Sequence, residues 1–402
     1  MAFQQGISGL NAASKNLDVI GHNIANSGTV GFKASRAEFS SLVASSMGTS
    51  NTTNAGFGVE VAAVAQQFTQ GGMTMTGNGL DVAINGNGFF KLQMPDGTAT
   101  YSRAGNFKLD QKGDVVTNDG AHVMGYKPDA SGKMVAPIVP LSFPTGMPIA
   151  PKQTASIKAA LNLDARADGS EPTGTYATSV VVFDSLGTPI PVNMDFKRAP
   201  TPPAPAPALN QWTVTVTDSS GNPLGTGTLD FDTSGNYISG SPLPLNVGTR
   251  SGAANPFIAD LDLTNVTQFS TKFAVADLTQ DGYTAGALKS INISDDGTVM
   301  ASYSNGVTRA EAQLALTSFR NPQGLVPVGG NNWVVSAESG APVDGKPGSG
   351  SLGSLRSGAL EDSNVDLTAE LVNMMTAQRS YQANAQTIKT QDQIMSTLVN
   401  LR

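Results

Sequence analysis

The sequence contains no cysteine and only two histidines among its 402 residues, so it lacks most side chains that support nucleophilic or metal chemistry. Without cysteine the chain forms no disulfide, no reactive thiolate and no cysteine-ligated metal site. His22 and His122 each stand outside the H-x-x-x-H and H-E-x-x-H spacings of zinc sites, and each is interpreted as a solvated or packed histidine. We therefore expect no catalytic residue, no metal and no cofactor.

Charge is scarce as well. Charged residues make up 14% of the chain, against roughly 25% in typical globular proteins. The net charge is -7, and nothing resembles the clustered lysine and arginine that phosphate backbones require, so nucleic acid is not expected as a partner. No apolar run approaches the ~20 residues that cross a bilayer, and the N-terminus lacks the basic and apolar regions of a secretory signal. We expect neither a membrane partner nor Sec-type secretion.

The helix breakers proline and glycine are unevenly distributed. No proline precedes Pro95 or follows Pro347, and no glycine follows Gly358. A tail of ordinary composition would contain several of these residues. The segment 359–402 is therefore free to form one long helix.

Ser363 or Asn364 can cap the start of this helix, and Asp366 and Glu370 place negative charge where the helix dipole favours it. Apolar residues then recur with the 4,3 alternation of a coiled-coil seam, and a shorter seam at the N-terminus ends at residues 26–28. The apolar members, which we predict to form a polymerisation seam, are Phe3, Ile7, Leu10, Leu17, Ile24, Leu367, Leu371, Met374, Tyr381, Ile388, Met395 and Val399.

Two interpretations of these seams are open. Each helix can be an ordinary amphipathic helix packed on a local core. A helix of about 36 residues is ~54 Å long, however, which exceeds the reach of one small domain. Its apolar stripe then needs other chains, or the N-terminal helix together with other chains, so the second interpretation is a helical homopolymer joined through the terminal helices.

The residues between the helices predict β structure. Alternating apolar residues in 80–84 and 90–94, separated by two Asn-Gly pairs, predict a hairpin. Trp212, Val214 and Val216 predict one face of a strand. Further turn signals are Gln111–Asp114, Asp184–Gly187, Ser219–Asn222, Ser234–Asn236 and Asp295–Gly297.

Two proline-rich segments mark places where regular structure is interrupted. The segment 137–151 is interpreted as a boundary between folded parts. The segment 199–208, which reads APTPPAPAPA from Ala199, falls inside a β region and is interpreted as the tip of a loop.

One stretch imitates a calcium-binding loop. Asp230, Asp232, Ser234 and Gly235 occupy the first, third, fifth and sixth places of the EF-hand pattern, but the twelfth place is Ser241 instead of a bidentate glutamate. The flanking residues favour strands instead of helices. A β-turn with hydrogen bonds from an aspartate side chain is the preferred interpretation.

Three blocks of sequence are highly specific. Residues 9–39 read GLNAASKNLDVIGHNIANSGTVGFKASRAEF and include NLDVIG, NIAN and GFK. Residues 77–92 read GNGLDVAINGNGFFKL and residues 101–110 read YSRAGNFKLD. Residues 358–402 include NVDL and AQRSYQANAQTIKTQDQ. In sequence, order and placement these blocks closely resemble the conserved blocks of the flagellar rod and hook protein family.

The resemblance implies a nested, multi-domain axial protein that is mainly β with long terminal α-helices. Residues 1–70 and 358–402 are expected to form an inner helical coiled-coil polymerisation domain. Residues 71–144 and 284–357 are expected to form a middle β domain, and 145–283 an outer inserted β domain. Rod proteins of the family resemble a shorter version without this insertion, so the length favours a hook subunit.

A hook subunit is a structural protein, not an enzyme, that polymerises into a curved, flexible, hollow tube and transmits torque from the basal body rod to the filament. The partners that the resemblance implies are further copies of the chain, the distal rod protein, the hook cap, the hook-filament junction proteins and the flagellar type III export apparatus. The implied location is extracellular, in the hook and basal body of the flagellum, reached without a cleaved signal peptide.

Two alternatives are weighed against the hook subunit. A distal rod-type axial protein with an enlarged insertion would form a straight, rigid tube. A secreted β-rich enzyme or binding protein, such as a carbohydrate-binding adhesin, would need a cleft of convergent acids or aromatic residues, and aromatics make up only 6% of the chain.

Overall fold

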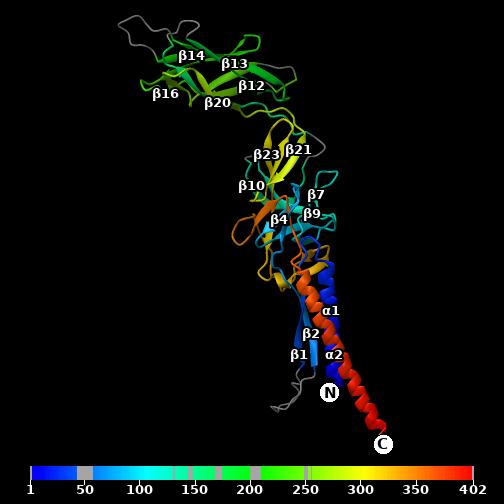
Figure 1. Ribbon diagram of the computed structural model, residues 1–402. Coiled ribbons are helices and arrows are strands. Elements are labelled where there is room, and N and C mark those ends of the chain that lie inside the picture. Colours follow the sequence, from blue (N-terminus) through cyan, green and yellow to red (C-terminus); the bar gives the residue numbers. More distant parts are fainter. Residues whose placement is uncertain are drawn as a thin grey trace. The chain divides into compact units, whose positions relative to one another are not determined.

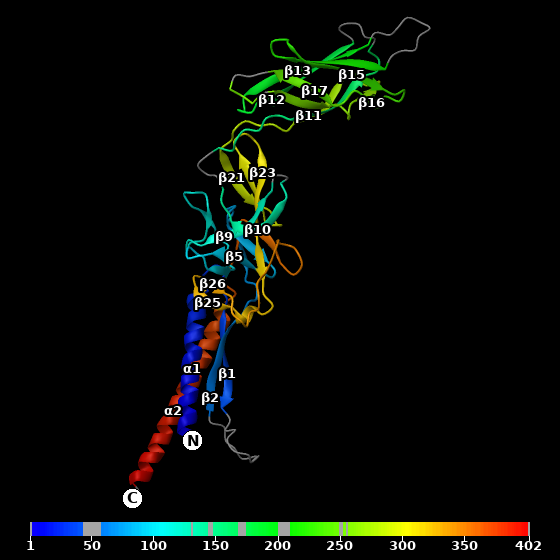
Figure 2. The same ribbon diagram turned by 180° about the vertical axis from the view of Figure 1, so that it is seen from behind.

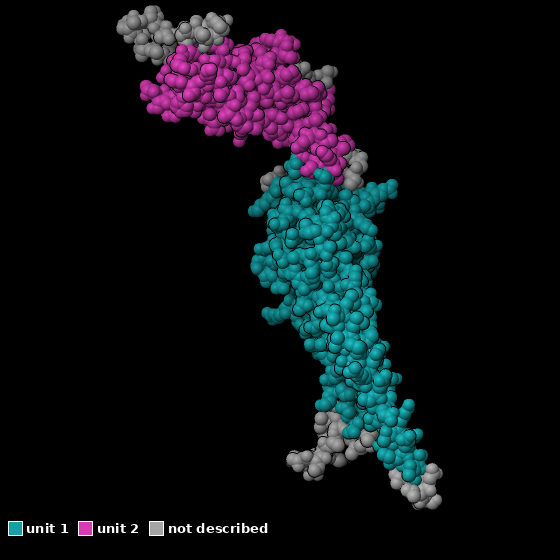
Figure 3. Space-filling view, in the orientation of Figure 1, with its two compact units in different colours: residues 1–145, 290–301, 308–402 teal, residues 146–289, 302–307 magenta. Residues whose placement is uncertain are grey.

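The computed structural model describes the chain in eight stretches, residues 2–42, 58–129, 132–143, 148–167, 174–199, 210–248, 252–254 and 256–400. It divides into two compact units, coloured in Figure 3, which are Met1–Thr145 with Ser290–Ala301 and Thr308–Arg402, and Gly146–Lys289 with Ser302–Val307. The first break between them falls inside the proline-rich segment 137–151. The further division into inner, middle and outer domains stays a prediction. The predicted loop tip lies outside the described residues from position 200 to its end.

Two helices occupy the ends of the chain, α1 at Ala2–Ala25 and α2 at Leu367–Asn400 (Figure 1). The first was predicted from the N-terminal seam and the second from the absence of breakers, although the segment 359–402 opens with strand β29 (Ala359–Glu361) and the helix begins only at Leu367. The predicted cap of the second helix was wrong, because Asp366 and neither Ser363 nor Asn364 fills that place. Its Oδ1 accepts hydrogen bonds from the backbone N–H groups of Thr368 at 2.9 Å and Ala369 at 3.2 Å, which satisfies two of the free donors of the first turn.

A long hairpin, β1 (Ser35–Leu42) and β2 (Gly58–Gln66), follows α1 in the sequence and lies beside the helices (Figures 1 and 2). The two strands pair antiparallel from Ser35 with Gln66 to Leu42 with Gly58, with one bulge at Glu38. Gly58 comes so close to α1 that an added Cβ would lie 2.0 Å from the Oγ of Ser8. The hairpin therefore packs directly against the N-terminal helix.

The largest sheet belongs mainly to the first unit and is antiparallel wherever its pairs are described. Its strands are β5 (Phe89–Gln93), β6 (Ala99–Ser102), β7 (Lys108–Leu109), β8 (Val115–Val116), β9 (His122–Pro128), β10 (Met134–Pro140), β21 (Leu288–Ile293), β22 (Thr298–Tyr303), β23 (Thr308–Leu314), β24 (Leu316–Ser318), β25 (Val326–Gly329), β26 (Asn332–Val334) and β27 (Val343–Gly345), and a 3-10 turn, η1, spans Pro322–Gly324. The main order is β21-β22-β23-β9-β5-β6-β26-β25.

The predicted hairpin across residues 80–94 was wrong. Strand β4 (Val82–Asn85) pairs with β28 (Ser354–Ser357), while β5 pairs with β6, β9 and β24. The Asn-Gly pairs let the chain pass from one sheet to another, and Gly86 has a φ of 112° beside the backbone of Gly353. Strand β3 (Met73–Met75) likewise pairs with β29 (Ala359–Glu361). Segments from the two ends of the chain thus fold together.

The second unit consists of two sheets that share one core. One contains β11 (Ser156–Asp164), β17 (Leu243–Gly248), β18 (Phe257–Asp262), β19 (Thr267–Phe269) and β20 (Ala274–Gln280), and the other β12 (Thr175–Phe183), β13 (Pro189–Arg198), β14 (Gln211–Asp218), β15 (Pro223–Phe231) and β16 (Tyr237–Ser239). Trp212, Val214 and Val216 are fully buried in that core, as their alternation predicts. Gly225 and Gly227 give β17 room to approach, since a Cβ on either would lie 2.9 Å from a leucine side chain.

The other predicted turns are confirmed. They connect β7 with β8, β12 with β13, β14 with β15, β15 with β16, and β21 with β22. In the fourth of these, Oδ1 of Asp232 accepts hydrogen bonds from the backbone N–H groups of Ser234 at 2.8 Å and Asn236 at 2.7 Å. The stretch that imitates a calcium loop is therefore an aspartate-stabilised turn, and these hydrogen bonds, chiefly that from Asn236, lower the pKa of Asp232.

Candidate assembly site on the terminal helices

The helices α1 and α2 run antiparallel and touch through small residues. A Cβ added to Gly6 would lie 2.9 Å from Cγ1 of Ile388, and one added to Gly9 would lie 2.9 Å from the amide of Asn384. Ala13 and Ala377 are buried nearby. Glycine and alanine allow two helix backbones to approach closely, so this contact is narrow and buries few large apolar side chains.

The contact within the chain is displaced by one position from the predicted seam. Residues of α1 that face α2 include Gly6, Gly9, Ala13, Ile20 and Asn23, and residues of α2 that face α1 include Glu370, Ala377 and Asn384. Each precedes a position of the heptad seam by one residue, counting the small or polar seam members Ser14, Gly21, Gln378 and Ala385. Because one residue rotates the chain by about 100°, the two helices turn the apolar stripe away from each other.

The predicted seam residues consequently retain much of their exposure. The exposed ones are Phe3, Ile7, Leu367, Leu371, Tyr381 and Met395, with exposed fractions from 37% to 55%, and the partly buried ones are Leu10, Leu17, Ile24, Met374 and Ile388. Of these, Ile388 also touches Gly6 of α1. The side chain of Val399 lies outside the described residues. The structure thus leaves an apolar strip on each helix available to a partner.

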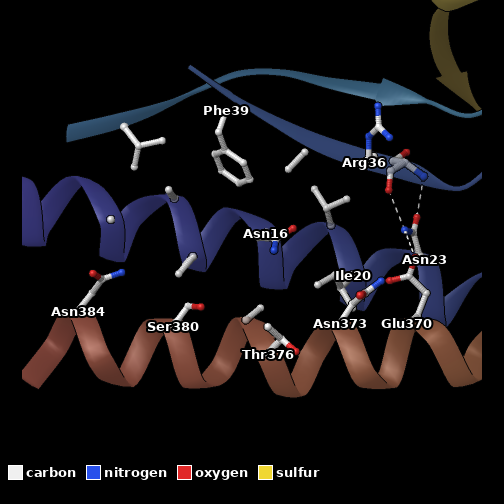
Figure 4. A pocket seen from close by; sticks show the side chains of 18 of the residues that line it. Asn16, Ile20, Asn23, Arg36, Phe39, Glu370, Asn373, Thr376, Ser380 and Asn384 are labelled. Atoms are coloured by element: carbon white, nitrogen blue, oxygen red, sulfur yellow. Dashed lines mark hydrogen bonds between the residues drawn. The ribbon is translucent and has the colours of Figure 1, made fainter. Parts of the chain in front are cut away.

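A groove of about 1120 Å³ lies between the two helices and the β1–β2 hairpin (Figure 4). Its walls combine small residues with side chains that form hydrogen bonds. The labelled polar side chains Asn373, Thr376, Ser380 and Asn384 project from α2 toward α1. Phe39 of β1 points toward the groove from the hairpin side.

Two asparagines of the signature blocks hold the base of this assembly together. Asn23 is buried, exchanges two hydrogen bonds of 2.8 Å with the backbone of Ser35, and donates a third, of 3.2 Å, to the carboxylate of Glu370 (Figure 4). Asn364 accepts a hydrogen bond of 2.7 Å from the backbone N–H of Ala34 and donates one of 2.7 Å to the carbonyl of Gln67. The NIAN and NVDL elements therefore join the helices to the hairpin.

A buried ion cluster lies next to this base. Nζ of Lys33 is 2.6 Å from Oε1 of Glu361, and Nη1 of Arg103 is 3.2 Å from Oε2 of the same carboxylate. Lys33 also donates to the carbonyl of Thr69 at 2.7 Å. Burial lowers the pKa of Lys33, while the Glu361 carboxylate opposes that shift, and burial likewise lowers the pKa of Arg103. Sequence reasoning missed this cluster, although Lys33 and Arg103 both lie in the specific blocks.

The part of the chain that the structure describes shows few features of a metal site or a membrane-spanning segment. No group of three or more histidines, cysteines, aspartates or glutamates is placed there to bind a metal ion. The ring of His22 packs edge-on against Phe32, with 5.5 Å between ring centres, and His122 lies in β9. Neither described helix is long and apolar enough to cross a membrane.

Family models match four parts of the chain. The flagella basal body rod protein model matches residues 3–33, and the flagellar hook protein FlgE/F/G D1 domain model matches 83–164. The flagellar basal body protein FlaE D2 domain model matches 149–283, and the flagellar basal body rod FlgEFG protein C-terminal model matches 356–401. The first and last of these cover most of α1 and α2, and the third covers most of the second unit.

Relatives match over the whole chain. The flagellar hook proteins FlgE of Salmonella typhimurium and Escherichia coli strain K12 are 40% and 41% identical, with 100% of both chains covered. That of Borreliella burgdorferi is 32% identical, covering 100% of this chain and 99% of its own.

A crystal structure of Helicobacter pylori flagellar hook protein FlgE2 shares the fold with a TM-score of 0.55 at 14% identity, covering 70% of this chain and 99% of its own. The full-length relatives include the inserted region, which favours the hook over the rod-type and adhesin alternatives. The chain therefore belongs to the flagellar hook protein family and is a structural subunit of the bacterial flagellar hook.

Proposed function

We propose that copies of this chain join through the apolar strips of α1 and α2 to form a curved, flexible, hollow tube that transmits torque from the rod to the filament. The observation that carries the proposal is the one-position displacement of the helix contact, which leaves Leu371 51% and Tyr381 37% exposed although α1 lies beside them. An amphipathic helix normally buries its apolar stripe. A neighbouring copy would complete that burial here.

The size of the strips suits a cooperative polymer. Burying a large apolar side chain completely contributes ~1.5–3 kcal/mol, so completing the burial of a half-exposed one contributes about 1 kcal/mol. Six such residues together contribute on the order of 6 kcal/mol, whereas association costs on the order of 4–15 kcal/mol of lost freedom. A single contact is then weak, and a chain held by several neighbours is stable. Such a subunit stays separate until it reaches a growing tube.

The proposal also assigns each part of the chain a place in the tube. Residues 1–70 and 358–402 would form the inner tube wall, with 71–144 and 284–357 in the middle and 145–283 outside. Helical packing supports a strong inner wall, and the polar, glycine-rich β surfaces offer weak contacts that can exchange while the hook bends. The further partners would be the distal rod protein, the hook cap, the hook-filament junction proteins and the type III export apparatus, which delivers the chain outside the cell without a cleaved signal.

Electron microscopy of purified chain under polymerising conditions tests the proposal. The wild type should form curved hollow tubes, and Leu371→Asp should lower tube yield at least tenfold, because a carboxylate replaces an exposed apolar contact. Thr390→Asp is the matched control, since Thr390 is exposed on the same helix about 100° round from Leu371. Tubes from Leu371→Asp in normal yield would refute the role of the strips, and a loss that is equal in both variants would show that any added charge blocks assembly.

A further inference from the structure

The helix α2 extends past the end of α1. It has 34 residues against 24 in α1, and because Gly6 lies opposite Ile388 in an antiparallel pair, α1 runs out near position 392. Figures 1 and 2 both show the C-terminal end of α2 beyond the N-terminal end of α1. We call residues 392–400 the overhang. Ile394 and Met395 within it are about half exposed.

The overhang cannot reach the groove of its own chain. It is the straight continuation of the same helix whose residues from Glu370 to Asn384 line that groove. The distance along the helix from Asn384 to Ile394 is ~15 Å at 1.5 Å per residue. An overhang that covers this groove must therefore belong to another copy of the chain.

The groove has room for part of a further helix. Its volume is about 1120 Å³. Gly9, Ala12 and Ala13 line it, so small residues form its floor on the α1 side.

The two surfaces also match in chemical character. The groove is lined by amides and hydroxyls as well as small apolar residues, and the overhang presents Gln393, Ser396 and Thr397 beside its two exposed apolar side chains. Oε2 of Glu370 is a buried groove atom for which the described residues provide no hydrogen-bond partner. A hydrogen-bond donor on the helix of another copy would satisfy it.

We propose that the overhang of one copy lies in the groove of the next copy, which rests on the proposed self-assembly and adds the direction of the contact. The two surfaces lie on different parts of the same chain, so the contact is head to tail. A head-to-tail contact that does not close into a ring generates an open helical polymer. The overhang–groove contact thus links copies along the direction of the terminal helices.

Disulfide trapping in assembled tubes tests the contact, because the natural chain has no cysteine that could interfere. Full-length chains with Met395→Cys and with Ser380→Cys are mixed, polymerised and treated with a mild oxidant. Two cysteines form a disulfide only when their Cα atoms lie within ~7 Å. The expected result is a cross-linked pair in at least fivefold higher yield than when Met395→Cys is mixed with Thr390→Cys, which lies on the same helix outside the groove.

The other outcomes overturn the proposal in different ways. Tubes without preferential cross-linking would refute the overhang–groove contact and leave self-assembly standing, whereas a wild-type chain that forms no tubes would refute both. A disulfide between Ser46→Cys and Ser380→Cys within one unassembled chain would show that the chain's own residues 43–57 occupy the groove.

A second pair of variants avoids dependence on cysteine. A chain that ends at Asp392 keeps the groove and lacks the overhang, and Ser380→Trp fills the groove and keeps the overhang. Neither should polymerise alone, and their mixture should form one-to-one heterodimers in analytical ultracentrifugation at protein concentrations high enough to populate a single weak contact. Tubes from the shortened chain alone, or two inactive variants that fail to pair, would overturn the proposal.

Discussion

Lys33 and Glu361 are 328 positions apart in the chain and form an ion pair of 2.6 Å in which neither side chain is exposed. The pair connects the segment after α1 to the segment before α2. Arg103 of the β region bonds the same carboxylate, and the backbone N–H of Gly71 donates to it at 3.0 Å. One carboxylate thus holds together four segments of the first unit. In the sequence these include the segment that follows the C-terminal end of α1 and the segment that precedes the N-terminal end of α2.

Glu361→Gln should lower the stability of the first unit by about 3–5 kcal/mol, because it leaves two buried cations without their anion. Urea unfolding followed by the fluorescence of Trp333, which is buried in this unit, measures the loss. Glu38→Gln serves as the control, since its pair with Arg36 is exposed and such pairs contribute under ~1 kcal/mol. Equal losses in the two variants would contradict the central position of Glu361.

Replacing all three members of the cluster should lower the stability of the first unit less than replacing the carboxylate alone. The variant Lys33→Met, Glu361→Met, Arg103→Met places apolar side chains where three charges were desolvated, and such exchanges are often neutral or stabilising. We expect it to unfold at a higher urea concentration than Glu361→Gln. A triple variant less stable than the single one would show that the cluster contributes net stability beyond its desolvation.

Asn23→Ala should release the β1–β2 hairpin from the helices. The change leaves the N–H and C=O of Ser35 without their partners, at a cost of about 1–3 kcal/mol. The amide of Ser35 should then exchange with solvent roughly tenfold faster or more, as measured by hydrogen exchange. Asn26→Ala is the control one residue past the end of α1, because its side-chain hydrogen bonds join it to His22 and Thr29 and none of them reaches the hairpin. Unchanged protection of Ser35 in Asn23→Ala would refute this role.

Two glycines of α1 should respond differently to substitution by alanine. Gly21 has no atom within 4 Å of an added Cβ, so Gly21→Ala should stabilise the helix by about 0.5–1 kcal/mol. Gly6→Ala should lose that gain, because its Cβ would lie 2.9 Å from Ile388, and the added change Ile388→Ala should restore it. Thermal melts at concentrations below assembly, followed by circular dichroism, measure the difference. Equal effects at both glycines would argue against the close helix contact.

The sequence was sufficient for features set by nearby residues. The presence of a long C-terminal helix follows from the absence of breakers, and the strand face of Trp212 follows from alternation, because both depend on residues a few positions apart. The pairing of β4 was out of reach, since its partner β28 lies about 270 positions away and two Asn-Gly pairs are an equally good signal for a hairpin and for a crossing between sheets.

The assembly site was accessible only in part. The apolar stripe could be found from its spacing. The neighbour that covers it could not be predicted, because small residues one position away form a second contact surface within the chain. Whether the helices meet through Gly6 and Ala377 or through the seam positions Ile7 and Gln378 depends on how closely the two backbones approach. The role of Lys33 was hidden as well, since a lone lysine in a sequence is normally a surface residue.

Acid should weaken the second unit through Asp164. Arg166 binds both oxygens of its carboxylate, at 2.9 and 2.7 Å, and this lowers the pKa of Asp164 from 3.8 to about 2. A depressed folded-state pKa contributes stability that is present above pH ~4 and is lost as the pH falls toward 2. Between those values the wild type should therefore lose stability more steeply than Asp164→Asn, which does not titrate.

The fluorescence of Trp212, fully buried in this unit, reports the acid transition. The effect should be modest, because the Arg166 side chain is 59% exposed and solvent screens the pair. Arg166→Gln should move the acid midpoint upward, since the carboxylate then titrates nearer its ordinary pKa, while Arg309→Gln, whose pair with Glu311 lies elsewhere, should not. An acid midpoint unchanged in both Asp164→Asn and Arg166→Gln would mean that other carboxylates control the transition.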